Sequence, residues 1–233
     1  MKYILSNLGS GTSVGGSVVK PAHAFATDLS LTYEKELKIA KKKAQIRAGL
    51  VLKNIGTKVS YTDNGEQEFL PANLGLGTCI KVHLDDRNAL ALAIDINKLM
   101  VPTPVSAYLT DHQGNVTTNP NYDLDADGIA DYKQQSMVSS LFSSFADAPG
   151  GINEELNEIM ISSGLEYWYN DMFALRCGYY YEHQNKGNRQ FFSMGIGVRY
   201  KIFNFNFSYI LPASKAQTNP LDNTLRFSMI FEM

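Results

Sequence analysis

Carboxylates recur at alternate positions in one polar stretch of the chain. The run Asp123-Leu124-Asp125-Ala126-Asp127-Gly128-Ile129-Ala130-Asp131 combines four aspartates with a glycine that permits a sharp bend. Oxygen ligands spaced in this way suit a hard cation such as calcium. The twelfth position is Gln134 rather than glutamate, so the EF-hand pattern fails. Two interpretations stand: a thrombospondin-repeat-like calcium loop formed by Asp123, Asp125, Asp127 and Asp131, or an acidic, solvated loop.

Other residue types that often carry chemistry show no productive spacing. The histidines are dispersed along the chain: His23, His83, His112 and His183. No nucleophile elbow is present, and no base is paired with a serine. We therefore predict a protein that is not an enzyme and that has no cofactor, apart from calcium in the aspartate loop.

Apolar and polar residues alternate along most of the segment from Phe191 to Leu211. Its apolar side comprises Phe192, Met194, Ile196, Val198 and Tyr200, then Phe203, Phe205, Phe207, Tyr209 and Leu211. Successive side chains of a strand point to opposite faces, so the segment is predicted to be a β-hairpin with a tight turn near Ile202.

The same alternation predicts ten antiparallel strands in all. They cover residues 1–6, 24–33, 43–53, 73–84, 89–97, 159–169 and 173–182, the two strands of the hairpin, and 224–233. A charged connection is expected over 34–42. The two cysteines, Cys79 and Cys177, fall on opposite faces of these strands, which disfavours a disulfide between them.

Composition narrows the class of protein. The 233 residues carry a net charge of -2 and include 13 Tyr, 12 Phe and 18 Gly, which favours a sheet protein and gives no sign of a nucleic-acid partner. The absence of an 18-residue apolar run excludes a transmembrane helix. A β-barrel is compatible, since only every second residue of its strands faces lipid. Met1 leads directly into a strand-like segment, so we expect an exported protein with this sequence to lack its signal peptide.

The connections favour a transmembrane barrel. Those after odd-numbered strands are long and those after even-numbered strands are short, as in outer-membrane barrels. Aromatic clusters at 167–169 and 179–181 match two interfacial girdles. The short loop 170–172 places Glu166 across from Arg176, which predicts an ion pair in the lumen. A soluble sheet protein with its polar face outward is the alternative.

Residues 100–157 are not strand-like. We expect them to form a long extracellular loop with short helices, inserted into a single barrel domain that spans 1–233. Met137, Leu141, Phe142 and Phe145 recur at near-helical spacing. They predict either a loop helix that packs on its own barrel or a surface that binds partners.

Several runs of the chain resemble the PorV (LptO) family. They include Asn54-Ile55-Gly56-Thr57-Lys58-Val59-Ser60-Tyr61-Thr62-Asp63-Asn64-Gly65, Phe145-Ala146-Asp147-Ala148-Pro149-Gly150-Gly151, Glu166-Tyr167-Trp168-Tyr169-Asn170 and Asn185-Lys186-Gly187-Asn188-Arg189-Gln190. The resemblance covers nearly the whole chain. It implies the outer-membrane barrel of the type IX secretion system, related in fold to the FadL fatty-acid transporters. About ten of its 14 strands would be present here, and the others are expected before Met1.

The resemblance also implies partners and a location. A member of this family receives folded cargo with a C-terminal secretion signal at the translocon and carries it to an attachment complex that includes a PorU-type sortase. We therefore expect a protein of the bacterial outer membrane that contacts lipid, cargo, sortase and translocon. Two alternatives stand: a FadL-like transporter of hydrophobic small molecules and a soluble β protein with a ligand groove. The first is disfavoured by charges on the polar side of the strands: Lys43, Arg47, Arg176, Arg199 and Arg226.

Overall fold

A computed structural model describes residues 1–7, 9, 11–14, 17–62, 67–111, 113–213 and 223–232. The chain divides into two compact units. Unit 1 comprises Met1–Leu29, Val51–Leu74 and Leu99–Leu156, and unit 2 comprises Ser30–Leu50, Gly75–Lys98 and Asn157–Met233. No helix among the described residues is long and apolar enough to cross a membrane.

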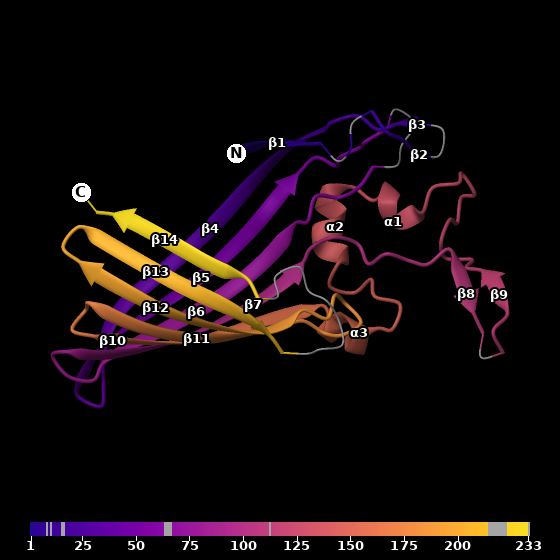
Figure 1. Ribbon diagram of the computed structural model, residues 1–233. Coiled ribbons are helices and arrows are strands. Elements are labelled where there is room, and N and C mark those ends of the chain that lie inside the picture. The colour runs from indigo at the N-terminus through magenta and orange to yellow at the C-terminus, as the bar shows by residue number, and fades with distance from the viewer. Residues whose placement is uncertain are drawn as a thin grey trace. The chain divides into compact units, whose positions relative to one another are not determined.

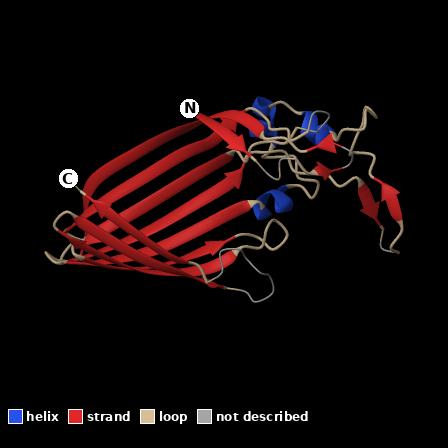
Figure 2. Cartoon of the chain, turned by 45° about the horizontal axis from the view of Figure 1, so that its top comes forward, coloured by secondary structure: helices blue, strands red, loops and turns tan. Residues whose placement is uncertain are grey.

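One ten-stranded sheet dominates the fold (Figures 1 and 2). Its strands are β1 Lys2–Ser6, β4 Ala22–Ile39, β5 Lys42–Gly56, β6 Asn73–His83, β7 Asn88–Leu99, β10 Ile159–Tyr169, β11 Phe173–Tyr181, β12 Gln190–Tyr200, β13 Phe203–Pro212 and β14 Leu225–Phe231. Each strand pairs with the next one along the chain. The pairs β1–β4, β7–β10 and β10 through β14 are antiparallel. The predicted all-β class with ten strands is confirmed.

The sheet order runs from β1 at one end to β14 at the other. Within the part of the chain that the structure describes, the ten strands thus form an open sheet. Closure into a 14-stranded barrel, a single domain over 1–233 and an extracellular insertion at 100–157 stay predictions.

The connection between β4 and β5 is shorter than expected. A charged linker over 34–42 is wrong, because β4 continues to Ile39 and β5 begins at Lys42. Ala40 and Lys41 form the turn with φ angles of 48° and 68°. Glu34 of this stretch accepts hydrogen bonds from Gln45 and Arg47 of β5.

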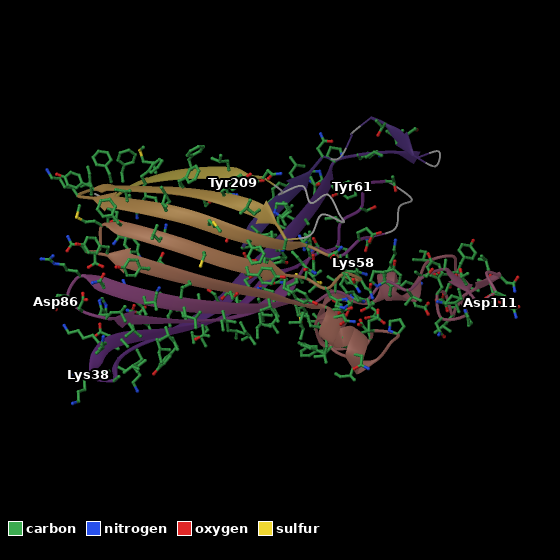
Figure 3. The ribbon with its side chains drawn as sticks, turned by 60° about the horizontal axis from the view of Figure 1, so that its bottom comes forward. Lys38, Lys58, Tyr61, Asp86, Asp111 and Tyr209 are labelled. Carbon is green, nitrogen blue, oxygen red and sulfur yellow. The ribbon has the colours of Figure 1, made fainter. Side chains whose placement is uncertain are left out.

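Short turns join β4 to β5, β6 to β7, β10 to β11 and β12 to β13. Lys38 and Asp86 mark the first two of these turns in Figure 3. Asp85 stabilises the second turn by accepting hydrogen bonds from the backbone N–H groups of Arg87 and Asn88, both 2.8 Å long. The other connections are longer, so the sorting of connections by length holds in the structure.

Residues 100–157 contain three short helices and a hairpin. The helices are α1 Asp131–Gln134, α2 Met137–Ser143 and α3 Ile152–Asn157. A segment free of strands was expected, but β8 (Tyr108–Thr110) pairs with β9 (Val116–Thr118). Asp111 closes this hairpin by accepting hydrogen bonds from the backbone N–H groups of Gln113 and Asn115. Three-residue strands are too short to show an alternation in sequence. Two further short strands, β2 (Ser13–Val14) and β3 (Ser17–Val18), pair within the loop after β1.

Candidate functional site

The apolar face of the sheet is exposed. In unit 2, the side chains of Ile94, Leu175 and Phe227 are 40%, 59% and 68% exposed. The small buried cluster of the same unit consists of Ala89, Ala174 and Trp168. A soluble sheet protein buries its large apolar residues and exposes polar ones. The reversed distribution is the one expected for strands whose apolar face meets lipid.

The opposite, polar face carries a hydrogen-bonded network. Glu166 of β10 faces Arg176 of β11 in the strand register, and the Arg176 Nε donates to its carboxylate. Nη1 of Arg176 donates to Oδ1 of Asn206 on β13 over 2.7 Å. Trp168 Nε1 donates to the other Glu166 oxygen. The expected facing pair is thus present, whereas its position in a lumen stays a prediction.

Glycine makes room for this network. A Cβ atom at Gly197 of β12 would lie 2.8 Å from Nη1 of Arg176 and 3.0 Å from Oδ1 of Asn206. A larger residue would therefore displace the guanidinium from its partners. Next to the network, a groove of about 730 Å³ extends over β6, β7 and β10 to β14. It is lined by charged side chains, including Asp95 and Arg226, together with small and apolar residues.

Three of the four candidate calcium ligands come together, two from the loop before α1 and one from the first residue of α1. Carboxylate oxygens of Asp123, Asp125 and Asp131 lie within 4.8 Å of one another. Asp127 is engaged elsewhere, accepting from the Ile129 backbone N–H at 2.8 Å and from Nε2 of Gln134 at 3.0 Å. Partial desolvation raises the pKa of the Asp125 carboxyl, and its contact with Asp123 adds to the rise. Such a cluster favours the binding of a positive charge.

The predicted partner-binding residues lie on or next to α2. Phe142 and Phe145 are 75% and 49% exposed, whereas Met137 and Leu141 are half-buried.

Polar residues instead anchor this helix. Ser136 caps its N-terminus, and Ser140 and Ser144 are fully buried. The Ser144 hydroxyl contacts the Met100 sulfur. Within α2, Ser140 is therefore more buried than Phe142, the reverse of what an ordinary amphipathic helix shows.

Residues 1–106 match the model of a family described as type IX secretion system protein PorV. This match supports the identification of the chain as a PorV-type protein. The matched family is a component of the type IX secretion system. No curated protein matches the chain.

The match to the PorV family covers β1 to β7 and the first residues of the loop that follows. The aspartate cluster, α2 and the pair of Glu166 and Arg176 lie outside the matched residues. The family match therefore gives no information on these residues.

Two ion-pair groups escaped the sequence analysis. The Glu158 carboxylate bridges Nζ of Lys98 at 2.5 Å and Nζ of Lys186 at 2.9 Å, joining β7, the start of β10 and the loop after β11. Glu182, 4% exposed, accepts two hydrogen bonds from the Arg189 guanidinium at 2.6 and 2.8 Å. Both groups fix the loop 182–189. The residues of the first group are far apart in sequence, and those of the second are separated by a turn. No sequence periodicity relates the residues of either group, so the sequence did not predict them.

Trp168 was also assigned wrongly. We expected it in an aromatic girdle, but it lies on the polar face and is only 7% exposed. Trp168 and Glu166 are two residues apart in β10, so their side chains lie on the same, polar face of the sheet. The expected girdle position rested only on the closeness of Trp168 to the end of the strand.

Proposed function

We propose that this chain is the outer-membrane β-barrel component of the type IX secretion system. In this role it binds cargo with C-terminal secretion signals and delivers it to the surface attachment complex and its PorU-type sortase. It acts as a carrier rather than as an enzyme. The observation that carries the proposal is the exposed apolar face of the sheet, because a protein of a secretion system with this face needs a lipid surface to cover it.

The loop helices support a carrier function. Phe142 and Phe145 at α2 and Ile152 and Leu156 on α3 are all at least 49% exposed. The capping Ser136 and the buried Ser140 anchor α2. Exposed aromatic residues on an anchored element are suited to act as hot spots for a protein partner.

A pull-down from outer membranes tests the proposal. We expect the wild-type protein to recover signal-bearing cargo and sortase, and Phe142→Asp to reduce their recovery about tenfold through loss of one aromatic hot spot. Ser139→Asp is the matched control, because it adds the same charge at an exposed position of the same helix. Equal recovery by both variants would remove α2 from the proposal, and a wild-type protein that recovers neither partner would contradict the carrier role.

A FadL-like transporter of hydrophobic small molecules is the second candidate. The groove on the polar face favours it by its volume of about 730 Å³. The charges of Glu166, Arg176 and Arg226 in its lining oppose an apolar conduit. Loss of fatty-acid uptake on deletion of the gene, with cargo secretion intact, would favour the transporter over the carrier.

We also propose that the aspartate cluster binds calcium. Calorimetry with calcium chloride should give saturable heat, and Asp125→Asn should weaken the binding about tenfold by removing one charged ligand. Because the pKa of Asp125 is raised, protons compete with the cation, and affinity should fall as the pH drops toward that pKa. Asp86→Asn, in a turn of unit 2, is the control. Absence of heat at neutral pH would rule out the site.

A further inference from the structure

Trp168 is surrounded by positive charge on the polar face of unit 2. The guanidinium carbons of Arg199 and Arg176 lie 5.1 and 5.4 Å from the centre of a Trp168 ring, and the Lys81 Nζ lies at 5.9 Å. All three are within the range of a cation–π contact. The ring therefore holds cations from β6, β11 and β12 close together although they repel one another.

The carboxylates nearby do not neutralise all of these cations. Arg176 is paired with Glu166, and Arg47 of β5 is paired with Glu34 at 3.0 Å. Within the described residues, neither Lys81 nor Arg199 forms an ion pair. The charges of Lys81 and Arg199, both next to the Trp168 ring, are thus left without an ion-pair partner among the described residues. An anion in contact with both side chains would be stabilised by both charges.

A cavity adjoins these two cations. It has a volume of about 230 Å³ and is lined by Arg47, Lys81, Trp168 and Arg199, with Gln45 as a further hydrogen-bond donor. Glu166 and Asp171 also contribute to its lining. A cavity of this size accommodates a small polar group rather than an acyl chain. Guanidinium groups bind oxyanions through paired N–H donors, and lysine adds a point charge.

We propose that this cavity is a binding site for a phosphate group, held by Lys81 and Arg199 against the Trp168 ring. A phosphate carries between one and two negative charges near neutral pH, which matches the two cations without carboxylate partners. The group is either free inorganic phosphate or the phosphomonoester of a larger molecule such as an anionic lipid. Phosphate binding at this cavity does not require cargo binding, because only side chains of the polar face take part in it.

The sequence contains a single tryptophan, so emission excited selectively at tryptophan, and not at the tyrosines, reports on this site alone. Inorganic phosphate is titrated into the detergent-solubilised protein, with sodium chloride holding the ionic strength constant. We expect a saturable change in Trp168 emission that sodium acetate at equal ionic strength does not reproduce. Micelles doped with phosphatidic acid or with phosphatidylcholine distinguish a lipid headgroup from the free ion. If only phosphatidic acid competes with inorganic phosphate, the phosphomonoester headgroup is a ligand of the site.

Charge-removing variants locate the effect. Lys81→Gln and Arg199→Gln should each weaken phosphate binding about tenfold, the loss of one hydrogen bond to a charged group. Arg199→Lys should recover part of the affinity. Arg226→Gln is the matched control, because it removes the same charge from the same face but does not line the small cavity.

Calorimetry of each variant, with circular dichroism to verify its strand content, separates lost binding from lost folding. A phosphate response no greater than that of acetate would overturn the proposal. So would an equal loss of binding in Arg226→Gln, since it would reveal general attraction to a positive face.

Discussion

Replacing Ile94 with arginine is expected to destabilise the protein in a bilayer by about 2–4 kcal/mol, the cost of an arginine that faces lipid at the midplane of the membrane. Ile94 is in the middle of β7 and is 40% exposed on the apolar face. On a lipid-facing surface an arginine loses its hydration, whereas on a water-facing surface the same change has almost no effect. Urea unfolding of the protein folded into phospholipid vesicles measures the difference.

The neighbouring residue supplies the control. Ala93 belongs to the same strand but points to the polar face, where Gly164 of β10 is its register partner. Ala93→Arg should change the free energy of unfolding by less than 1 kcal/mol, because a hydrated groove accepts the charge. If both variants lost the same stability, or Ile94→Arg lost none, the apolar face would not contact lipid and the membrane location would be untenable.

The strand pattern was readable from sequence because one physical rule governs it. Side chains alternate across a strand, so Phe192, Met194 and Ile196 had to share a face whatever covered that face. The rule says nothing of where a strand stops when both faces become charged. For this reason the sequence did not predict the turn at Ala40 and Lys41. Glu34 and Arg47 on the two strands that this turn joins form an ion pair.

The contents of the polar face were less predictable. Facing residues on strands joined by a short turn follow from the register, so Glu166 and Arg176 could be paired in advance. The cluster around Trp168 unites β6, β10, β11 and β12, and its formation depends on the direction of long side chains rather than on register. In the aspartate loop, the backbone conformation determines which carboxylates converge. The Asp127 carboxylate instead accepts a hydrogen bond from Gln134.

Loss of the Glu158 carboxylate should be the most damaging change at the loop end of unit 2. Its side chain is 13% exposed, and the two lysines it bridges, Lys98 and Lys186, are 9% and 20% exposed. Glu158→Gln retains the shape of the side chain but leaves two ammonium groups close together without its negative charge. Breaking a buried ion pair in this way costs about 3 kcal/mol or more, so the midpoint of urea unfolding should fall clearly.

A double variant separates charge from shape. Lys186→Gln alone should have a smaller effect than Glu158→Gln, because Glu158 then keeps Lys98 as a partner. Adding Lys186→Gln to Glu158→Gln should restore part of the lost stability, since it removes one of two repelling cations. Additive losses in the double variant would show that Glu158 acts through packing. A positive coupling would instead identify electrostatics as the means by which β7, β10 and the loop 182–189 are held together.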